Sequence, residues 1–89
     1  MDKIRKHIIF EGYVQGVGFR YKAYHTARMY GISGWVRNRS DGTVEMEAEG
    51  TPRDIEDLIL ALEKHTWGQI DNIRSEKIPL HNDYSFEIR

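Results

Sequence analysis

The sequence contains no cysteine. A disulfide framework, a zinc site built on thiolates and a cysteine nucleophile are therefore excluded. The fold has to be held by packing and hydrogen bonds alone, and this composition suits a reducing compartment. With 89 residues, the chain has room for one modest core, so we expect a single domain over residues 1–89.

Long apolar runs and an excess of basic charge are also missing. The apolar run at residues 8–10 follows a basic N-terminus, but Glu11 interrupts it, so we expect neither a secretion signal nor a membrane span. The net charge is −1, whereas a nucleic-acid-binding domain usually carries a basic surface. These features predict a cytoplasmic monomer whose partners include neither nucleic acid nor membrane.

Metal-binding spacing is absent as well. The four histidines are scattered, with no pair at helical spacing: His7, His25, His65 and His81. They are more typical of solvated or hydrogen-bonded side chains than of metal ligands. We therefore expect neither a metal nor another cofactor.

Apolar periodicity and the positions of glycine divide the chain into alternating strands and helices. Period-two alternation marks the strands, i, i+4 spacing marks the helices, and glycine marks loops and helix ends. The predicted elements are a strand over 7–13, a loop over 14–19, a helix over 20–30, a strand over 34–39, a turn over 40–42, a strand over 43–49, a helix from 52 to about 65, a strand over 70–78 and a final strand over 84–88.

Two of these segments carry further signals. In the strand over 43–49, apolar side chains alternate with Glu45, Glu47 and Glu49, which predicts one face on the core and one wet, acidic face. Thr51 and Pro52 are suited to the cap and the first position of the second helix. The order βαββαβ with a short last strand is that of a ferredoxin-like α+β sandwich, an antiparallel sheet with two helices on one face.

The segment from Gly12 to Arg20, which joins the first strand to the first helix, is the first candidate site. Its glycine-bearing backbone and the free N–H groups of a helix N-terminus are suited to binding an anion. Arg20 opposes the helix dipole there, and a bound phosphate would neutralise both. A solvated arginine, or one paired with a surface carboxylate, is the alternative, and the loop fits neither the Walker pattern nor GxGxxG.

Asn38, just before the predicted turn, is the second candidate. An asparagine at this position commonly hydrogen-bonds the backbone of the turn. The residue type and position alone therefore leave its role open.

Two longer patterns resemble the signatures of the acylphosphatase family. The first is Gly12-x-Val14-Gln15-Gly16-Val17-x-Phe19-Arg20. The second is Gly34-Trp35-Val36-Arg37-Asn38-x-x-x-Gly42-x-Val44-x-x-x-x-x-Gly50. The similarity runs over nearly the whole chain, to Phe86-x-Ile88.

The resemblance implies a ferredoxin-like fold, in agreement with the element order. It implies hydrolysis of the carboxyl-phosphate anhydride bond of a small-molecule acyl phosphate to a carboxylate and inorganic phosphate, by water and without a metal. Inorganic phosphate or sulfate would compete for the site. The implied roles are phosphoryl binding by the backbone of Gln15, Gly16, Val17 and Gly18, phosphoryl binding by the side chain of Arg20, and orientation of the attacking water by Asn38.

Two other functions share part of this pattern. RNA-recognition motifs share the βαββαβ order, but their aromatic platform lies on the third strand, where this chain has acidic residues. A non-catalytic anion sensor would use Arg20 and the loop without needing Asn38. The connection over 64–69 departs from the Pro- or Ser-bearing connection of many relatives, which bears on substrate access. Tyr21 stands where the related domain of hydrogenase-maturation carbamoyltransferases usually has proline, which favours a free-standing enzyme.

Overall fold

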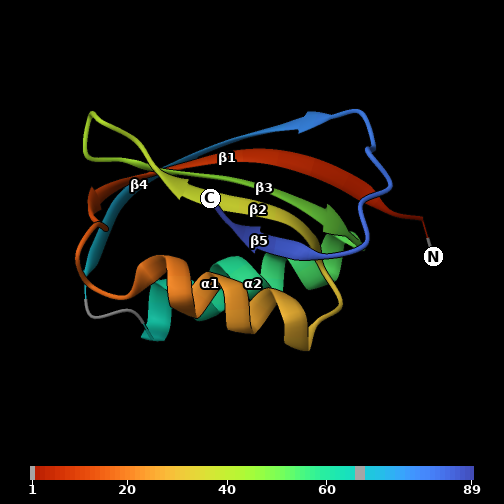
Figure 1. Ribbon diagram of the computed structural model, residues 1–89, viewed down its shortest axis with the longest axis horizontal. Coiled ribbons are helices and arrows are strands. Elements are labelled where there is room, and N and C mark those ends of the chain that lie inside the picture. The colour runs from red at the N-terminus through yellow and green to blue at the C-terminus, as the bar shows by residue number, and fades with distance from the viewer. Residues whose placement is uncertain (1, 66–67) are drawn as a thin grey trace.

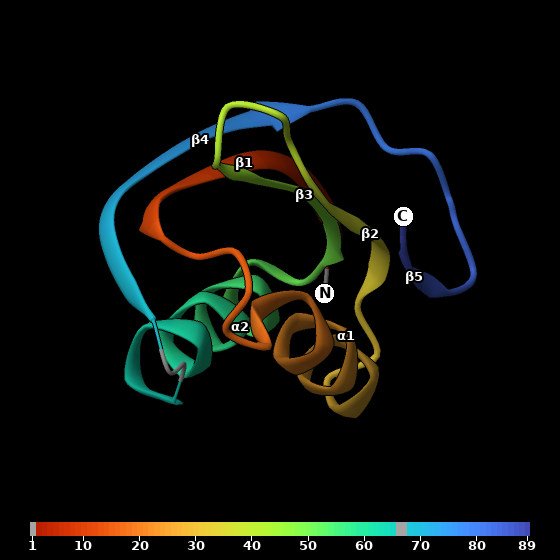
Figure 2. The same cartoon turned by 60° about the vertical axis from the view of Figure 1, so that its left-hand side comes forward.

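The computed structural model describes residues 2–65 and 68–89. In chain order these residues form β1 (Ile4–Tyr13), α1 (Phe19–Met29), β2 (Ser33–Asn38), β3 (Val44–Gly50), α2 (Pro52–His65), β4 (Gln69–Ile78) and β5 (Phe86–Ile88). The strands make one sheet in the order β4-β1-β3-β2-β5, and both helices cover the same face of it (Figure 1, Figure 2). The predicted ferredoxin-like α+β fold is confirmed.

The pairing at one edge of the sheet adds a feature that the sequence did not reveal. β1, β2, β3 and β4 pair in antiparallel fashion, as expected, whereas β5 runs parallel to β2. In this register Val36 lies opposite Ile88, and the N–H of Arg89 donates to the carbonyl oxygen of Val36 at 2.8 Å. The last residues of the chain are therefore fixed beside the end of β2.

The core lies between the sheet and the helices. The apolar residues of β3 face it with no exposed surface, as the alternation predicted, and so do Ile8 and Phe10 of β1. α1 contributes the fully buried Ala23 and Ala27, whose small side chains let the helix lie close to the sheet. The core-facing stripe of α2 is Ile55, Leu58 and Leu62, with Ile59 partly buried at its side.

Local hydrogen bonds set the ends of both helices. Thr51 caps α2, since its Oγ1 accepts the N–H of Asp54 at 3.1 Å. α1 ends at Met29 and is followed by the C-cap Tyr30 and a left-handed Gly31 (φ 67°), after which the N–H of Ile32 donates to the carbonyl oxygen of Ala27 at 2.8 Å. This 6→1 bond of a Schellman motif turns the chain directly into β2.

The open face of the sheet is not simply wet. Glu49 is 2% exposed, so the expectation of a wet acidic face is wrong at this residue. The reason is Arg5 of β1, which lies opposite Glu49, has no exposed surface and binds three carboxylates. Its Nε donates to Glu47 at 2.8 Å, and its Nη1 donates to Glu49 at 3.1 Å and to Asp83 at 3.0 Å. We call these four residues the Arg5 cluster.

The Arg5 cluster attaches the connection between β4 and β5 to the sheet. The N–H groups of His81 and Asn82 donate to the two carboxylate oxygens of Glu49 at 2.8 and 3.0 Å. Tyr84 is fully exposed and precedes β5, so the predicted last strand over 84–88 begins only at Phe86. The residues before Ser85 cross the open face, and the carbonyl oxygen of Ser85 then accepts the N–H of Gly34 in β2 at 3.0 Å.

These contacts shift the pKa of Glu49. Burial alone raises it, but the hydrogen bonds from His81, Arg5 and Asn82 outweigh burial, and the pKa lies below that of an ordinary glutamate. A carboxyl group whose pKa is lowered by folding stabilises the folded state above its unfolded pKa, about 4.3 for glutamate. That contribution is lost as the pH falls through the lower, folded value.

We predict that Glu49→Gln destabilises the protein at pH 7 and makes its stability less dependent on pH below about 5. Breaking a buried pair leaves the partner charge uncompensated, which typically costs about 3 kcal/mol or more. Urea denaturation from pH 7 to pH 3 measures both effects. Glu87→Gln is the control, because Glu87 is exposed and pairs only with Arg89, at 3.3 Å, in the described residues. Parallel pH curves for wild type and Glu49→Gln would contradict this role of the Arg5 cluster.

Candidate active site

The loop between β1 and α1 has the backbone that an anion site requires. Gly16 and Gly18 adopt φ angles of 73° and 78°, in the left-handed region where other residues are strained. A Cβ at either position would meet nothing within 4 Å. The need for glycine here is therefore conformational, and the space beside both residues is open.

The N-terminus of α1 opens into this loop with unpaired donors. Gly18 is the N-cap, no side chain in the described part of the chain caps the helix, and the first turn contains no acidic residue. The first helical hydrogen bond runs from the N–H of Lys22 to the carbonyl oxygen of Gly18 at 3.0 Å. The N–H groups of residues 19–21 precede that bond, so they remain available to a ligand and add the positive end of the helix dipole.

Arg20 lies at this helix end without an acidic partner. Its side chain is half-buried, and no carboxylate in residues 2–65 or 68–89 lies within 4 Å of it. The alternative of a pairing with a surface carboxylate is therefore not what the structure shows. Arg20 instead lines a cavity of about 200 Å³ together with Asn38. The remaining lining residues are Val14, Gly16, Gly18, Phe19, Tyr21 and Ile88.

Asn38 reaches the same cavity from the end of β2. It pairs with the core residue Val44, so its side chain lies on the helix-facing side of the sheet. Its Oδ1 is buried and has no hydrogen-bond partner among residues 2–65 and 68–89. Leaving a buried acceptor unpaired costs about 1–3 kcal/mol, which calls for an explanation such as a water or ligand in the cavity.

The turn after Asn38 is held by other side chains. The carboxylate of Asp41 accepts the N–H of Thr43 at 3.0 Å and its hydroxyl at 2.6 Å. These bonds lower the pKa of Asp41, the hydroxyl contributing most. The turn-capping interpretation of Asn38 therefore does not account for its Oδ1.

Gln15 has a second role that the sequence did not reveal. Its side-chain Nε2 donates to the carbonyl oxygens of Arg39 at 2.7 Å and of Thr43 at 2.9 Å. The loop that carries Gly16 and Gly18 is thereby tied to the hairpin that carries Asn38. The acceptors are main-chain groups 24 and 28 residues away, so no pattern of residue types signals this contact.

The connection between α2 and β4 supports the loop from behind. A Cβ at Gly68 would clash with the carbonyl oxygen of Tyr13 and lie 2.9 Å from Val17 Cγ2, so glycine is required where the two segments touch. Residues 66 and 67 of the 64–69 connection lie outside the described residues. Its expected influence on substrate access therefore stays a prediction.

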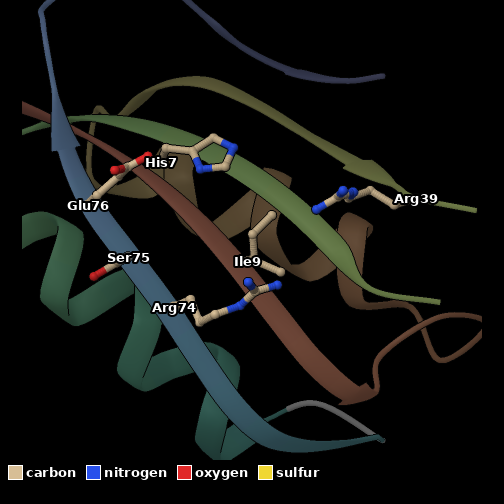
Figure 3. A pocket seen from close by; sticks show the side chains of 6 residues that line it. All are labelled: His7, Ile9, Arg39, Arg74, Ser75 and Glu76. Atoms are coloured by element: carbon tan, nitrogen blue, oxygen red, sulfur yellow. The ribbon is translucent and has the colours of Figure 1, made fainter. Parts of the chain in front are cut away.

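A larger hollow, of about 370 Å³, lies on the open face of the sheet (Figure 3). Its lining residues are His7, Ile9, Arg39, Arg74, Ser75 and Glu76, none of which lines the cavity at Arg20. Its charges are partly paired: His7 contacts Glu45 at 2.7 Å and Arg74 contacts Glu11 at 3.6 Å. Size alone is therefore a poor guide to the candidate site, and the unpaired groups at Arg20 and Asn38 favour the smaller cavity.

Across residues 2–65 and 68–89, no group of three or more histidine, aspartate or glutamate side chains is arranged to hold a metal ion. In the same residues, neither helix is long and apolar enough to cross a membrane.

Comparison with known proteins identifies the family. The model of the family described as Acylphosphatase matches residues 6–88. The chain belongs to the acylphosphatase family. An acylphosphatase of Bifidobacterium longum is 42% identical over 79 residues, which are 86% of this chain and 80% of that protein. One from Synechococcus sp. WH7803 is 42% identical over 86 residues, 96% of this chain and 86% of that protein.

Solved structures agree with this family assignment. The crystal structure of the Bacillus subtilis acylphosphatase superposes with a TM-score of 0.91 at 33% identity, covering 97% of this chain and 98% of that one. Full-length HypF in its phosphate- and nucleotide-bound form matches with a TM-score of 0.92 at 31% identity, but this chain covers only 12% of it. The predicted class, a hydrolase that acts on acyl phosphates, is confirmed by family membership.

We predict that Gln15→Ala strongly lowers kcat but lowers the free energy of unfolding only slightly. The hairpin keeps its own bonds, since the N–H of Arg39 still donates to the carbonyl oxygen of Thr43 and that of Gly42 to the carbonyl oxygen of Arg39. Their relative position loosens, and misplacement by about 1 Å can cost about 10²-fold in rate. The unfolding free energy should fall by only about 1–2 kcal/mol.

Steady-state kinetics and urea denaturation of the same preparations measure the two effects. Gln69→Ala is the matched control, because the Gln69 amide contacts the exposed Asp71 side chain, at 2.9 Å. If Gln15→Ala reduces kcat no more than Gln69→Ala does, the contact contributes nothing to positioning.

Proposed function

We propose that this chain hydrolyses acyl phosphates at the cavity between the loop and the end of β2, with the phosphoryl group held by the loop and Arg20 and the attacking water oriented by Asn38. The observation that carries the proposal is the convergence of two unpaired groups on one cavity. Arg20 has no carboxylate partner among the described residues, and Asn38 Oδ1 is buried without a donor.

The phosphoryl end of the substrate fits the positive side of the cavity. Phosphoryl transfer requires mainly positioning and stabilisation of charge on the equatorial oxygens. The backbone N–H groups of residues 15–18 and the free N–H groups at the start of α1 can donate to those oxygens. Arg20 can add a bidentate, charge-assisted contact. These donors supply the positive charge that a metal supplies in other phosphoryl-transfer sites, which supports a metal-free reaction.

The Asn38 side chain is placed to orient the attacking water. Its free Oδ1 can accept one hydrogen of a water molecule and so direct the oxygen lone pair at phosphorus. An amide cannot take up the proton, so the proton passes to the substrate's own phosphate, and the bond from phosphorus to the carboxylate oxygen breaks. Carboxylate is a good leaving group and needs no general acid. Inorganic phosphate and sulfate compete for the same donors, and a cytoplasmic monomer remains part of the proposal.

We predict that Asn38→Ala reduces kcat by about 10²-fold or more while leaving the affinity for inorganic phosphate nearly unchanged, because water orientation matters only on the way to the transition state. The measurement is phosphate release from an acyl phosphate, with and without excess chelator. Activity should survive chelation in the wild type.

Asn72→Ala, which removes an exposed contact to Glu11, is the control. Binding of phosphate by the wild type without turnover would identify an anion sensor instead of an enzyme. Activity lost on chelation and restored by Mg²⁺ would overturn the metal-free mechanism.

We predict that Arg20→Ala removes most of the stabilisation that phosphate confers. A ligand that binds only the folded state adds RT ln(1 + [L]/Kd), about 2.7 kcal/mol at a hundredfold excess over Kd. Without ligand, Arg20→Ala should match the wild type within about 0.5 kcal/mol, because no ion pair in the described residues is lost. Arg20→Lys should recover little, since a point charge does not reproduce the guanidinium fork.

Thermal melts with and without phosphate test this prediction. Arg53→Ala is the matched control, because the Arg53 side chain is 85% exposed on α2 and lies 4.0 Å from its partner Asp57. Equal stabilisation by phosphate in wild type and Arg20→Ala would place the anion elsewhere and end this assignment of the site.

A further inference from the structure

We propose that Tyr21 and Ile88 form the wall that binds the acyl group, and that the enzyme therefore prefers acyl phosphates with bulky apolar acyl groups, aromatic ones above all. The inference rests on the proposed function, because it concerns the part of the substrate that the phosphoryl site leaves unbound. It identifies the substrate class by the chemistry of the cavity next to Arg20.

The apolar surface of this cavity is of two kinds. Val14 and Phe19 are 1% and 2% exposed and belong to the core, so a ligand can gain little by touching them. Tyr21 and Ile88 also line the cavity, but they are 65% and 41% exposed. A substrate can therefore bury apolar surface on these two side chains, which is the favourable term in binding an apolar group.

The two exposed side chains that line the cavity come from opposite ends of the chain. Tyr21 stands in the first turn of α1, one residue after Arg20. Ile88 lies opposite Val36, two residues before Asn38, on the helix-facing side of β5. The start of α1 and the ends of β2 and β5 lie at the same end of the sandwich (Figure 1). An acyl group attached to a phosphoryl group at Arg20 is therefore within reach of both.

Contacts within the protein support both residues: a ring contact for the Tyr21 side chain and backbone pairing for Ile88. The Tyr21 ring packs edge-on against His25, one turn further along α1, with the ring centroids 4.4 Å apart and the planes at 75°. Ile88 is held by its pairing with β2 and by the following hydrogen bond from Arg89 to Val36. A preformed wall loses little conformational freedom when the acyl group binds, which favours affinity.

The charges of the cavity act against polar acyl groups. Arg20 is the one charged side chain among the described residues that line it. When Arg20 holds the phosphoryl group, a second carboxylate or an ammonium group on the acyl side finds no ionic partner there. Desolvating such a charge without a partner is unfavourable, so the cavity discriminates in favour of uncharged acyl groups.

The test is the ratio of kcat/KM for benzoyl phosphate to kcat/KM for acetyl phosphate, together with the inhibition constant of inorganic phosphate. In Tyr21→Ala we expect the ratio to fall about tenfold, the lower end of what an apolar pocket contributes to discrimination. Tyr21→Phe should keep the preference, because it keeps the ring. Ile88→Thr, which retains a β-branched side chain, should lower the ratio by a smaller factor.

Leu60→Ala is the matched control, since Leu60 on α2 is 42% exposed, about as much as Ile88, but does not line the cavity, and its ratio should equal that of the wild type. Inorganic phosphate has no acyl group, so its inhibition constant should stay the same in Tyr21→Ala.

Two results would overturn the inference while leaving the proposed function intact. One is an unchanged ratio in Tyr21→Ala. The other is an equal loss of kcat/KM with both substrates in Tyr21→Ala, together with weaker inhibition by phosphate. A wild type that hydrolyses neither substrate would instead overturn the proposed function. Circular dichroism melts confirm that each variant is folded, and the two Tyr21 variants decide the matter if Ile88→Thr weakens β5.

Discussion

The packing of α1 against β2 and β5 fixes the geometry on which the candidate site depends. Ala23 and Ala27 have no exposed surface, so the helix axis lies close to the sheet and its N-terminus is held beside the end of β2. Larger side chains at these positions would move the helix outward and carry Arg20 away from Asn38. The Gln15 amide then ties the intervening loop to the hairpin. A packing constraint and two hydrogen bonds thus hold the two halves of the candidate site in position.

The open face of the sheet also helps to fix the geometry of the candidate site. The Arg5 cluster holds the connection after β4 across the sheet, and that connection delivers β5 to its place beside β2. An ion-pair cluster of this kind is a weak source of net stability, because desolvation offsets much of the attraction. It specifies where the connection lies, and so where Ile88 stands. A buried network far from Arg20 is in this way linked to the acyl side of the cavity.

The sequence predicted the fold to the extent that periodicity determines it. The alternation in residues 43–49, the stripe of α2 and the glycine after α1 each have a local cause, and all were correct. Glu49 and Tyr84 were placed wrongly because their environments depend on the connection over 79–85, which crosses the open face through contacts distant in sequence. For the site, the two signature patterns identified Arg20 and Asn38 as candidates. The side-chain role of Gln15 depends on backbone carbonyls and was not visible in residue types.

The unpaired groups of the cavity distinguish it from the rest of the molecule. Elsewhere in the described residues, buried polar groups mostly have hydrogen-bond partners. The three carboxylates around Arg5 are an example, although Nη2 of Arg5 has no partner among these residues. At the candidate site, no side chain of the described residues caps α1, Arg20 has no carboxylate partner among them, and Asn38 Oδ1 has no donor there. Each feature alone costs free energy, and natural sequences tend to remove such costs unless a function requires them. A phosphoryl group and one water bound there would satisfy all three together, because the first needs donors and the second needs an acceptor. The groups that weaken the candidate site are thus the ones on which the proposed chemistry depends.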